Sequence, residues 1–397
     1  MNQNQIKTVV FLSNYFSHHQ KPFSDEMCAL LGDGYLFIET VAMDDERKNM
    51  GWGLNSLPNY VITAEELRRN QNIINDIINT ADVVITGSAP ENLLSQRKKE
   101  RKLILRYSER QLKKGTEPLK YLYRLVKWQL KNYPRDNIYM LSASAYTAAD
   151  YAKFGLFKNR CYKWGYFPAL KRYENVDALI SQKKRNSIIW VARFIDWKHP
   201  EIALDVAAKL KEEGYDFQLN MIGNGELLKK IKNDVLTRNL SEHITILGAM
   251  TPEEVRLYME KSAIHIFTSD RNEGWGAVLN ESMNSACAVI ASHAIGAVPF
   301  MIQDGVNGLI YQDGNKEDLY QKVKRILNDN DLCCLYGKNA YETITEKWNE
   351  RIAANRFMEL SNALLSGSKG EPLFDDGPCS IARILEDEWY NRNEQNI

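Results

Sequence analysis

The sequence predicts an α/β protein with two doubly wound parallel sheets. Short apolar runs alternate with segments of helical periodicity along most of the chain, and this alternation is typical of parallel strands that helices cover on both faces. The chain has 397 residues, which is enough for two domains with complete hydrophobic cores. Ligands bind such sheets beyond the carboxyl ends of the strands, so we expect the site in a cleft between the two domains.

Five predicted strands make up the first domain. Each is a short apolar run that ends in polar or turn residues, and a helical segment at 64–79 precedes the third run. The runs are residues 8–12, 35–39, 82–87, 102–107 and 137–141. Runs of this length between helical patterns predict a parallel sheet.

The second half repeats this pattern, with helices predicted at 200–211 and 226–238. A third helix is predicted to begin after Thr251, because threonine is a good N-cap and Pro252 suits the first helical position. The strands are predicted at residues 186–192, 217–222, 244–247, 264–267, 288–291 and 308–311.

The boundary between the domains is predicted near residues 166–183. We assign residues 1–170 to an N-terminal domain, 171–365 to a C-terminal domain and 366–397 to a C-terminal tail. The end of the chain is rich in acidic residues. It could be a polar tail, or it could form a helix from about Ser380 to Tyr390 that docks on the N-terminal domain.

The composition argues against several classes of function. Lys plus Arg and Asp plus Glu both number 51, so the net charge gives no sign of a nucleic-acid partner. The six cysteines form no Cys-x-x-Cys pair or Cys/His cluster, which argues against a zinc site and fits a reducing compartment. No apolar run reaches the roughly 20 residues that a membrane span requires, and the N-terminus lacks a signal-peptide layout. We therefore expect a cytoplasmic protein.

Positive charge is concentrated in residues 97–135. This segment holds 14 Lys and Arg against three Glu, with aromatic and aliphatic residues between them. One interpretation is a helix with an apolar core face and a solvated basic face. The other is a basic amphipathic surface for an anionic membrane or a lipid-phosphate acceptor. The second interpretation would make the protein peripheral at the inner face of the membrane.

Polar groups suited to a phosphate ester follow three strands of the second domain. Arg193 offers a planar fork and Lys198 a point charge on the same loop. The glycines of Gly223-Asn224-Gly225-Glu226 let the backbone approach a ligand, and Gly248-Ala249-Met250 could read a nucleobase edge. The alternatives are two solvated cations, a plain turn and a plain connection.

Glu273 and Glu281 lie eight residues apart. Glu273 stands in a Gly-rich loop, and Glu281 is predicted to lie two turns inside the following helix. A helical register would separate them by about 12 Å along the axis, which suits an extended ligand with hydroxyl groups at both ends and phosphates between. The N–H groups from Trp275 to Val278 could bind an anion at the helix N-terminus. The alternative is an acidic first turn that stabilises its own helix.

The second half resembles the family-4 retaining glycosyltransferases, which have the GT-B fold of two Rossmann-like domains facing a central cleft. The resemblance rests on Arg193 and Lys198, on Gly223-Asn224-Gly225-Glu226, and on Glu273 and Glu281, and it covers residues 186–355. It implies that Arg193 and Lys198 bind the donor diphosphate, Glu281 the ribose and Glu273 the transferred sugar. The predicted donor-binding residues are Arg193, Lys198, Gly223, Gly225, Glu226, Ala249, Met250, Glu273, Gly274, Trp275, Gly276, Ala277, Val278 and Glu281.

The first domain offers weaker candidates. The segment from Ser13 and Asn14 through His18 and His19 looks like the first-strand loop of bacterial capsular and exopolysaccharide glycosyltransferases, so these four residues are predicted on the acceptor side. Many relatives place a histidine at the end of a middle strand, and this sequence has none there. Glu109 is the substitute, with a structural pairing to Arg110 or another cation as the alternative. Catalytic candidates are thus Glu273, Arg193, Lys198, Glu109 and His18.

The predicted function is transfer of a sugar, with retention, from a UDP-sugar or related donor to a glycan or lipid-diphosphate-linked glycan in surface polysaccharide synthesis. No metal or other cofactor is expected, because two cations and a helix terminus can neutralise the diphosphate. The alternatives are a non-catalytic GT-B subunit of a transferase complex and a nucleotide-sugar epimerase.

Overall fold

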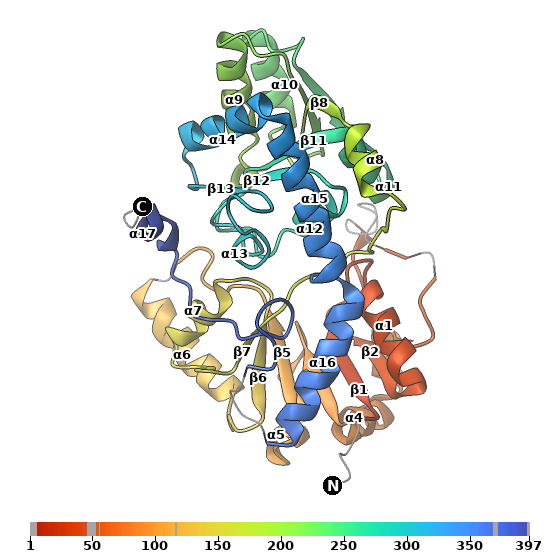
Figure 1. The fold of residues 1–397 in the computed structure, drawn as a ribbon. Helices are drawn as coiled ribbons and strands as arrows, with labels where there is room; N and C mark the ends of the chain where they lie inside the picture. The colour runs from red at the N-terminus through yellow and green to blue at the C-terminus, as the bar shows by residue number, and fades with distance from the viewer. Residues whose placement is uncertain (1–5, 46–52, 55, 116, 368–371, 395–397) are drawn as a thin grey trace. The chain divides into compact units, whose positions relative to one another are not determined.

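The computed structural model describes residues 6–45, 53–54, 56–115, 117–367 and 372–394, which form two compact units (Figure 1). The first unit comprises Met1–Ala169 and Asn349–Leu385, and the second comprises Leu170–Trp348 and Glu386–Ile397. The division differs from the predicted domains, because residues 349–365 group with the first unit. Within that unit, Phe357 lies about perpendicular to Phe23, with ring centroids 6.1 Å apart.

The first unit contains a seven-stranded parallel sheet in the order β3-β2-β1-β4-β5-β6-β7. All residues of β1, β4 and β6 are buried, as expected for a sheet with both faces covered. The order reverses between β1 and β4, so the loops that follow these two strands meet at the topological switch point. The strands are β1 Val9–Ser13, β2 Tyr35–Glu39, β3 Val61–Ile62, β4 Val83–Thr86, β5 Ile104–Ser108, β6 Ile138–Ser142 and β7 Cys161–Lys163.

The helix predicted at 64–79 is two helices, α3 and α4, which meet at Asn70. Asn70 leaves the helical region with φ −115° and ψ 34°. The helices of the first unit are α1 Lys21–Leu31, α3 Ala64–Arg69, α4 Gln71–Thr80, α5 Ser95–Lys99, α6 Pro118–Lys131, α7 Thr147–Ala152 and α16 Glu350–Leu365, with short 3₁₀ turns η1 Gly32–Gly34 and η2 Glu91–Leu94.

The basic segment 97–135 is not a single helix, because β5 interrupts it. Several of its cations are structural. Arg97 is fully buried and donates to the backbone oxygens of Ile78, Ala81 and Leu103 at 2.6–2.8 Å. Arg106 pairs with Glu91. The basic surface is therefore smaller than the sequence count implied.

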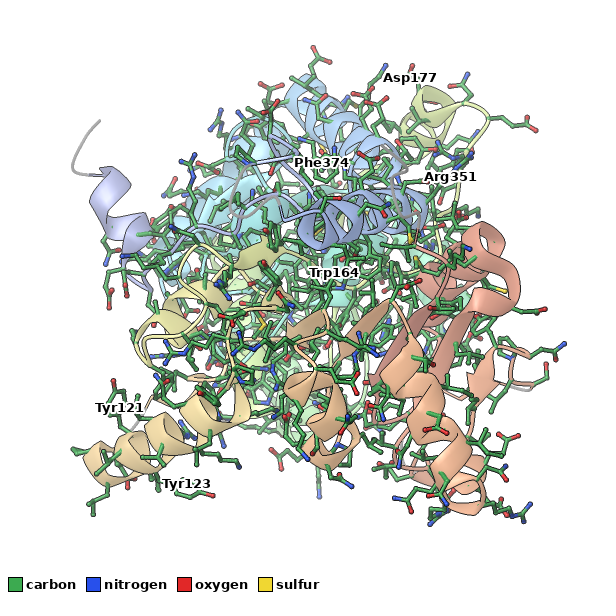
Figure 2. All side chains as sticks on the ribbon, turned by 90° about the horizontal axis from the view of Figure 1, so that it is seen from below. Tyr121, Tyr123, Trp164, Asp177, Arg351 and Phe374 are labelled. Atoms are coloured by element: carbon green, nitrogen blue, oxygen red, sulfur yellow. The ribbon has the colours of Figure 1, made fainter. Side chains whose placement is uncertain are left out.

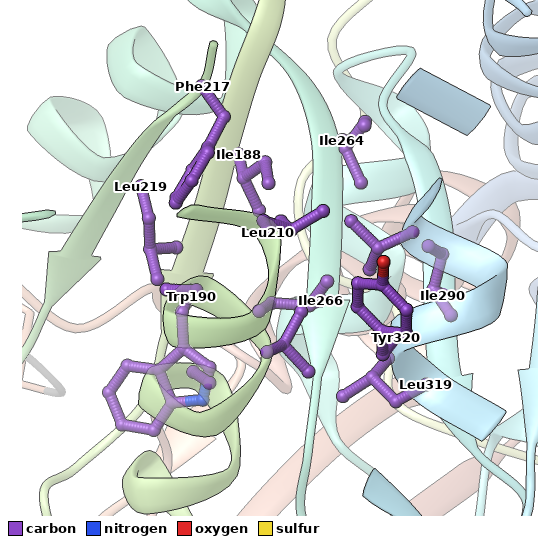
Figure 3. Packing of buried hydrophobic residues seen from close by; sticks show 14 of the residues in the cluster. Ile188, Trp190, Leu210, Phe217, Leu219, Ile264, Ile266, Ile290, Leu319 and Tyr320 are labelled. Atoms are coloured by element: carbon purple, nitrogen blue, oxygen red, sulfur yellow. The ribbon is translucent and has the colours of Figure 1, made fainter. Parts of the chain in front are cut away.

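The second unit contains a six-stranded parallel sheet in the order β10-β9-β8-β11-β12-β13, with its switch point between β8 and β11. Trp190, Leu210, Phe217, Ile266 and Leu319 belong to the core between this sheet and helices α9 (Pro200–Glu212) and α14 (Lys316–Asn328) (Figure 3). The strands are β8 Lys184–Val191, β9 Gln218–Ile222, β10 Ile244–Gly248, β11 Ser262–Phe267, β12 Ala288–Ser292 and β13 Leu309–Tyr311.

The N-cap predicted at Thr251 is confirmed, because its side chain accepts from the backbone N–H of Glu254. The Glu254 side chain in turn accepts from the Thr251 N–H, which completes a capping box. The helices of the second unit are α8 Val176–Ser181, α9 Pro200–Glu212, α10 Leu228–Thr237, α11 Pro252–Lys261, α12 Ala277–Asn284, α13 Val298–Met301, α14 Lys316–Asn328, α15 Asn330–Glu346 and α17 Trp389–Glu394, with the 3₁₀ turn η3 Asp196–Lys198.

The helix predicted at about 380–390 is wrong. This part of the chain runs extended along β7, where the Lys163 N–H donates to the Ser380 oxygen at 2.7 Å and the Ala382 N–H donates to the Cys161 oxygen at 2.9 Å. Partners on β7 satisfy backbone groups that a helix would satisfy internally. Helix begins only at Trp389. Residues 368–371 and 395–397 of the predicted tail lie outside the described residues. In the described part of the chain, no helix is long and apolar enough to cross a membrane.

Candidate functional site

The loops after β8 and β11 are tied together at the switch point of the second unit. The indole of Trp190 donates to Thr268 Oγ1 at 2.8 Å, and the Thr268 hydroxyl donates to the backbone oxygen of Lys198 at 2.7 Å. The Asp270 N–H donates to the Trp197 oxygen at 3.1 Å. These bonds fix the loop that carries the two cations against the loop that leads to Glu273.

Lys198 and Glu273 form an ion pair at this junction. Both side chains are only 11% exposed, and the Lys198 ammonium lies 4.4 Å from the centre of the Trp197 ring. Arg193 is exposed, with its guanidinium 5.8 Å from the centre of the same ring. The structure thus gathers Arg193, Lys198 and Glu273 around Trp197.

His199 is a residue of this junction that the sequence analysis missed. It adopts the left-handed conformation, with φ 49° and ψ 54°. Its Nδ1 lies 2.8 Å from Glu201 Oε1 and its Nε2 lies 3.4 Å from Asp270 Oδ2. Asp270 first, and then Glu201, raise the pKa of His199 to about 10. The imidazolium is therefore a third cation of the loop after β8, and the Glu201 and Asp270 carboxylates balance its charge. The available sequence signal was a histidine directly after Lys198.

Close packing and hydrogen bonds hold the Gly-rich loop before α12 in place. The Trp275 side chain is fully buried, and its indole donates to Asn280 Oδ1 at 2.9 Å. Gly276 has φ 93°, and a Cβ there would lie 2.8 Å from the Phe267 ring. The Ala297 N–H holds the Trp275 oxygen at 3.1 Å. Position 276 therefore requires glycine, which makes the turn into α12. The buried Trp275 side chain anchors that turn through its hydrogen bond to Asn280.

Glu281 does not stand in the predicted register. Helix α12 begins at Ala277, so Glu281 lies just over one turn inside it, and the segment from Glu273 to Gly276 is loop. The predicted separation assumed a continuous helix and does not apply. Burial raises the pKa of Glu281 to about 7, against the opposing effect of Arg256. The first N–H groups of α12, at Ala277 and Val278, have no acceptor one turn earlier in the helix.

The glycines after β9 have a packing role. A Cβ at Gly223 would lie 1.9 Å from the Ala192 oxygen, and one at Gly225 would lie 2.4 Å from the Phe194 oxygen. This close approach holds the loop after β9 against the loop that carries Arg193. Glu226 is exposed.

The two predicted residues after β10 differ in solvent exposure. Ala249 is exposed, whereas Met250 is half-buried. Met250 packs with Leu247 and Val278 on a small apolar cluster that includes Ile189. These side chains provide an apolar patch beside the α12 N-terminus.

In the first unit, the predicted residues Ser13 and Asn14 hold the backbone of the loop after β1. Ser13 is buried, and its hydroxyl donates to Asn14 Oδ1 at 3.1 Å. The Thr40 N–H donates to the oxygens of both residues at 2.9 Å. Glu39 accepts from the Phe16 N–H at 2.7 Å, and burial raises the pKa of this carboxyl.

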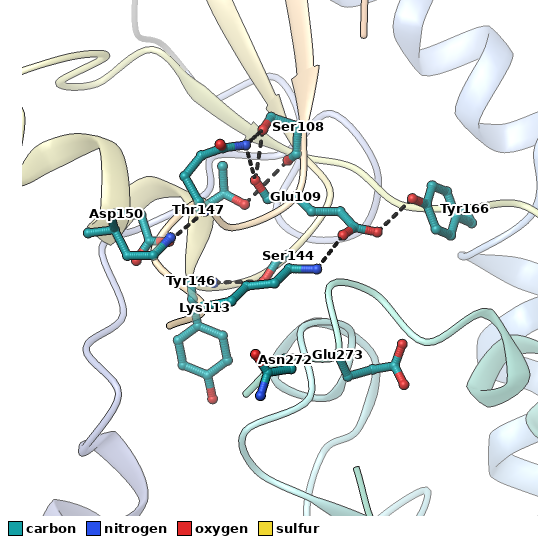
Figure 4. Close-up of polar contacts among 12 residues, drawn as sticks. Ser108, Glu109, Lys113, Ser144, Tyr146, Thr147, Asp150, Tyr166, Asn272 and Glu273 are labelled. Carbon is teal, nitrogen blue, oxygen red and sulfur yellow. Dashed lines mark hydrogen bonds and ion pairs between the residues drawn. The ribbon is translucent and has the colours of Figure 1, made fainter. Parts of the chain in front are cut away.

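The other first-unit candidates meet at Tyr166, which the sequence analysis also missed. The His18 and His19 rings lie 3.9 Å apart, and His19 stacks on Tyr166 at 5.8 Å. The Tyr166 hydroxyl donates to Glu109 at 2.6 Å, and Lys113 donates to the other oxygen of Glu109 at 2.7 Å (Figure 4). Burial first, and then His18, lower the pKa of His19 to about 3. His19 is therefore neutral at pH 7.

The cation that pairs with Glu109 is Lys113. Arg110 instead forms a buried ion pair with Asp150, whose carboxylate also accepts from the N–H groups of Gln111 and Leu112 at 2.7 Å. Across the described residues, no group of three or more His, Cys, Asp or Glu side chains could hold a metal ion.

Comparison with known proteins identifies the fold and a related family. Residues 172–343, which lie within the second unit, match the family model described as "Glycosyl transferases group 1". An uncharacterized glycosyltransferase of Methanocaldococcus jannaschii is 33% identical over 168 residues, covering 42% of this chain and 46% of the relative. The poly(ribitol-phosphate) alpha-N-acetylglucosaminyltransferase of Staphylococcus aureus is 24% identical, covering 44% and 34%. The matched segment spans less than half of each relative.

Solved structures extend the likeness of the fold to both units. The crystal structure of Anabaena HepE in complex with UDP superposes with a TM-score of 0.65 at 12% identity, covering 91% of this chain and all of that one. The two units are thus the Rossmann-like α/β domains of the GT-B architecture. The match to the group 1 glycosyltransferases is limited to residues 172–343 of the second unit.

Proposed function

We propose that this protein is a GT-B glycosyltransferase that moves a sugar from a nucleotide-sugar, a UDP-sugar by preference, to a glycan acceptor. The observation that carries the proposal is the gathering of Arg193, Lys198 and Glu273 beside the N-terminus of α12. Cations and a helix N-terminus suit a diphosphate. A carboxylate at the same point suits the hydroxyls of a sugar. The UDP bound to HepE supports the choice of nucleotide.

In the proposed complex the donor diphosphate binds Lys198 and displaces Glu273 from it. Lys198 is already held in place and nearly buried, so its side chain loses little conformational freedom when the anion binds. Glu273 then turns to the hydroxyls of the transferred sugar. Glu281 accepts from the ribose diol, and the apolar patch at Met250 supports the base.

Charge on the leaving diphosphate grows as the glycosidic bond breaks. Arg193, Lys198 and the first N–H groups of α12 would stabilise that charge more in the transition state than in the ground state. With these groups the diphosphate can be neutralised without a metal, so we propose a metal-independent reaction.

We propose that the first unit binds the acceptor, with Glu109 and the His18–His19 pair nearest to it. Retention at the anomeric carbon would follow from attack on the face from which the diphosphate leaves, with a diphosphate oxygen taking the acceptor proton. The acceptor proposed is a glycan or a lipid-diphosphate-linked glycan of a surface polysaccharide. A cytoplasmic location, with peripheral association at the inner face of the membrane, belongs to the same proposal.

A non-catalytic GT-B subunit is the second candidate function, and a nucleotide-sugar epimerase is the third. Loss of the cations or of the glutamates would favour the subunit, and all of them are present. An epimerase would consume the nucleotide-sugar without an acceptor. Product analysis with and without acceptor therefore separates the two enzymes.

The test of the donor site is substitution of its cations. A hydrogen bond to a charged group contributes about 1.5–3 kcal/mol, so Lys198→Ala or Arg193→Ala should lower turnover by roughly 10- to 150-fold or more. Lys209→Ala is the matched control, because Lys209 forms an ion pair with Glu317 on the helices of the same unit. Donor-dependent activity that is unchanged in both site variants would overturn the assignment. A thermal-shift screen of nucleotides, where saturating ligand stabilises by about 2.7 kcal/mol at 100 times Kd, identifies the donor class.

A further inference from the structure

Helix α6 exposes its apolar residues. None of its 14 residues is buried. Leu119 is 85% exposed, and the other members of the set are 53–72% exposed. The set, which we call the α6 outer face, is Leu119, Leu122, Tyr123, Val126 and Leu130, followed by Tyr133. Spacings of three and four residues place its helical members on one side of the helix. The first interpretation of the basic segment, a helix with an apolar core face and a solvated basic face, does not account for these exposed apolar residues.

The opposite side of α6 fixes the helix to its unit. Tyr121 stacks on Phe154 with ring centroids 5.1 Å apart, and Trp128 contacts Tyr151 at 4.8 Å. Gln129 donates to the Phe154 oxygen at 2.6 Å. Tyr121 and Tyr123 project from different sides of α6 in Figure 2. Because the inner side is anchored, the outward direction of the apolar face is set by the fold.

The charges of α6 have one sign. Between Pro118 and Lys131 the helix carries Lys120, Arg124, Lys127 and Lys131 and no Asp or Glu. Lys120 and Lys127 are exposed, and the Lys127 ammonium lies 5.7 Å from the centre of the Tyr123 ring. Flanking lysines around an apolar stripe with tyrosines are the composition of a helix that lies in a membrane interface.

A basic cavity of about 170 Å³ begins where α6 ends. Asn132 is part of its lining, and the charged groups on its lining are Arg135, Lys158 and Arg160, with no carboxylate among them. Arg135 is held by the Gly155 oxygen at 3.4 Å, and the Arg160 guanidinium lies 5.5 Å from the centre of the Tyr139 ring. Since a water occupies about 30 Å³, the cavity has room for a phosphate group.

We propose that the α6 outer face and this basic cavity together dock the first unit on a membrane that contains anionic phospholipid. The helix would lie in the plane between headgroups and acyl chains, and the cavity would take a headgroup phosphate. A second copy of the chain fits the surface less well, because two faces of the same positive sign would repel. The inference rests on the proposed membrane association of the transferase but not on sugar transfer itself.

The experiment is co-sedimentation of the full chain with phosphatidylcholine vesicles, with or without about one third phosphatidylglycerol. Wild type should pellet with the anionic vesicles only. Leu122→Ser/Val126→Ser should weaken binding by about tenfold or more, because two apolar side chains no longer enter the interface. Lys158→Gln/Arg160→Gln should weaken it by about 25-fold, since each cation near an anionic surface contributes about fivefold.

Ile73→Ser is the matched control, because Ile73 is 64% exposed on α4 of the same unit. It should bind vesicles as wild type does. If the double apolar variant fails to fold, Leu119→Gln replaces it. Wild-type binding by both double variants, or equal binding to neutral and anionic vesicles, would overturn the proposal. A third outcome would also overturn it. Wild type would self-associate without vesicles, and the apolar substitutions would abolish that self-association but leave vesicle binding unchanged. The assay contains no donor or acceptor, and nucleotide-induced thermal shifts of the same variants report separately on the donor site.

Discussion

The two units share one topology but differ in chemistry at the same point of the sheet. In each, the first strand is central and the strand order reverses beside it, at β1/β4 in the first unit and at β8/β11 in the second. The loop after β8 carries the charged residues Arg193, Lys198 and His199. The loop after β1 carries the His18–His19 pair, in which His19 is neutral.

This difference shows what the fold decides and what it leaves open. The switch point gathers the loops of both units at the ends of their strands, but the side chains decide whether an anion or a neutral polar group is bound there. Buried cations are also used differently. In the first unit Arg97 binds backbone oxygens of its own fold, whereas in the second unit Lys198 faces a carboxylate that a ligand can replace.

The largest effect should come from exchanging these two buried cations for alanine. Arg97→Ala removes the guanidinium that donates to the buried oxygens of Ile78, Ala81 and Leu103, so we expect the free energy of unfolding to fall by about 3–5 kcal/mol. Lys198→Ala should cost about 1–2 kcal/mol while greatly reducing donor binding. Urea unfolding measures both, with the exposed Arg101→Ala as control. Equal destabilisation by Arg97→Ala and Lys198→Ala would show that Lys198 is a structural cation, and would contradict the proposed difference between the two residues.

A pH-dependent effect of intermediate size is expected at Glu281. Its pKa is raised to about 7 by burial, so the unfolded chain ionises this carboxyl from about pH 4.5, before the folded protein does. This carboxyl therefore lowers the free energy of unfolding of the wild type progressively as the pH rises from about 4.5 to 7. Glu281→Gln should add less than about 1 kcal/mol at pH 5 and up to about 3 kcal/mol at pH 8.

The same titration bears on donor binding through Glu281. If the ionised carboxyl accepts from the ribose diol, wild-type affinity for UDP should rise as the pH passes through about 7, and the variant should lack that rise. Thermal unfolding with and without UDP measures both quantities. A stability gain that is equal at pH 5 and pH 8 would contradict burial as the cause of the shift.

How much the sequence could predict differs between the units. The Thr251 cap and most strand positions follow from local patterns, although the short edge strands β3 and β7 were not predicted. The Arg193, Lys198 and Glu273 group follows from loops that end neighbouring strands. His199 and Tyr166 were missed because their roles depend on partners distant in sequence, Asp270 for the first and Glu109 for the second. The extended chain near residue 380 was missed because its hydrogen-bond partners lie on β7, more than 200 residues earlier. The outward apolar face of α6 has helical periodicity, which does not say on which side the core lies.

The smallest effect compares a tyrosine–glutamate hydrogen bond in each unit. The Tyr166 hydroxyl donates to Glu109 and the Tyr173 hydroxyl donates to Glu260, both at 2.6 Å. Phenylalanine at either position removes one bond to a charged acceptor, but water can resolvate the part-exposed carboxylates. Both variants should therefore lose a similar amount of unfolding free energy, about 1 kcal/mol. Only Tyr166→Phe should also lower turnover at saturating donor or raise the KM for acceptor, because Glu109 belongs to the proposed acceptor side. Steady-state kinetics of the two variants decide the matter. If they lose turnover equally, or neither does, the Tyr166–Glu109 pair is structural, and the first unit has no role in the reaction at this point.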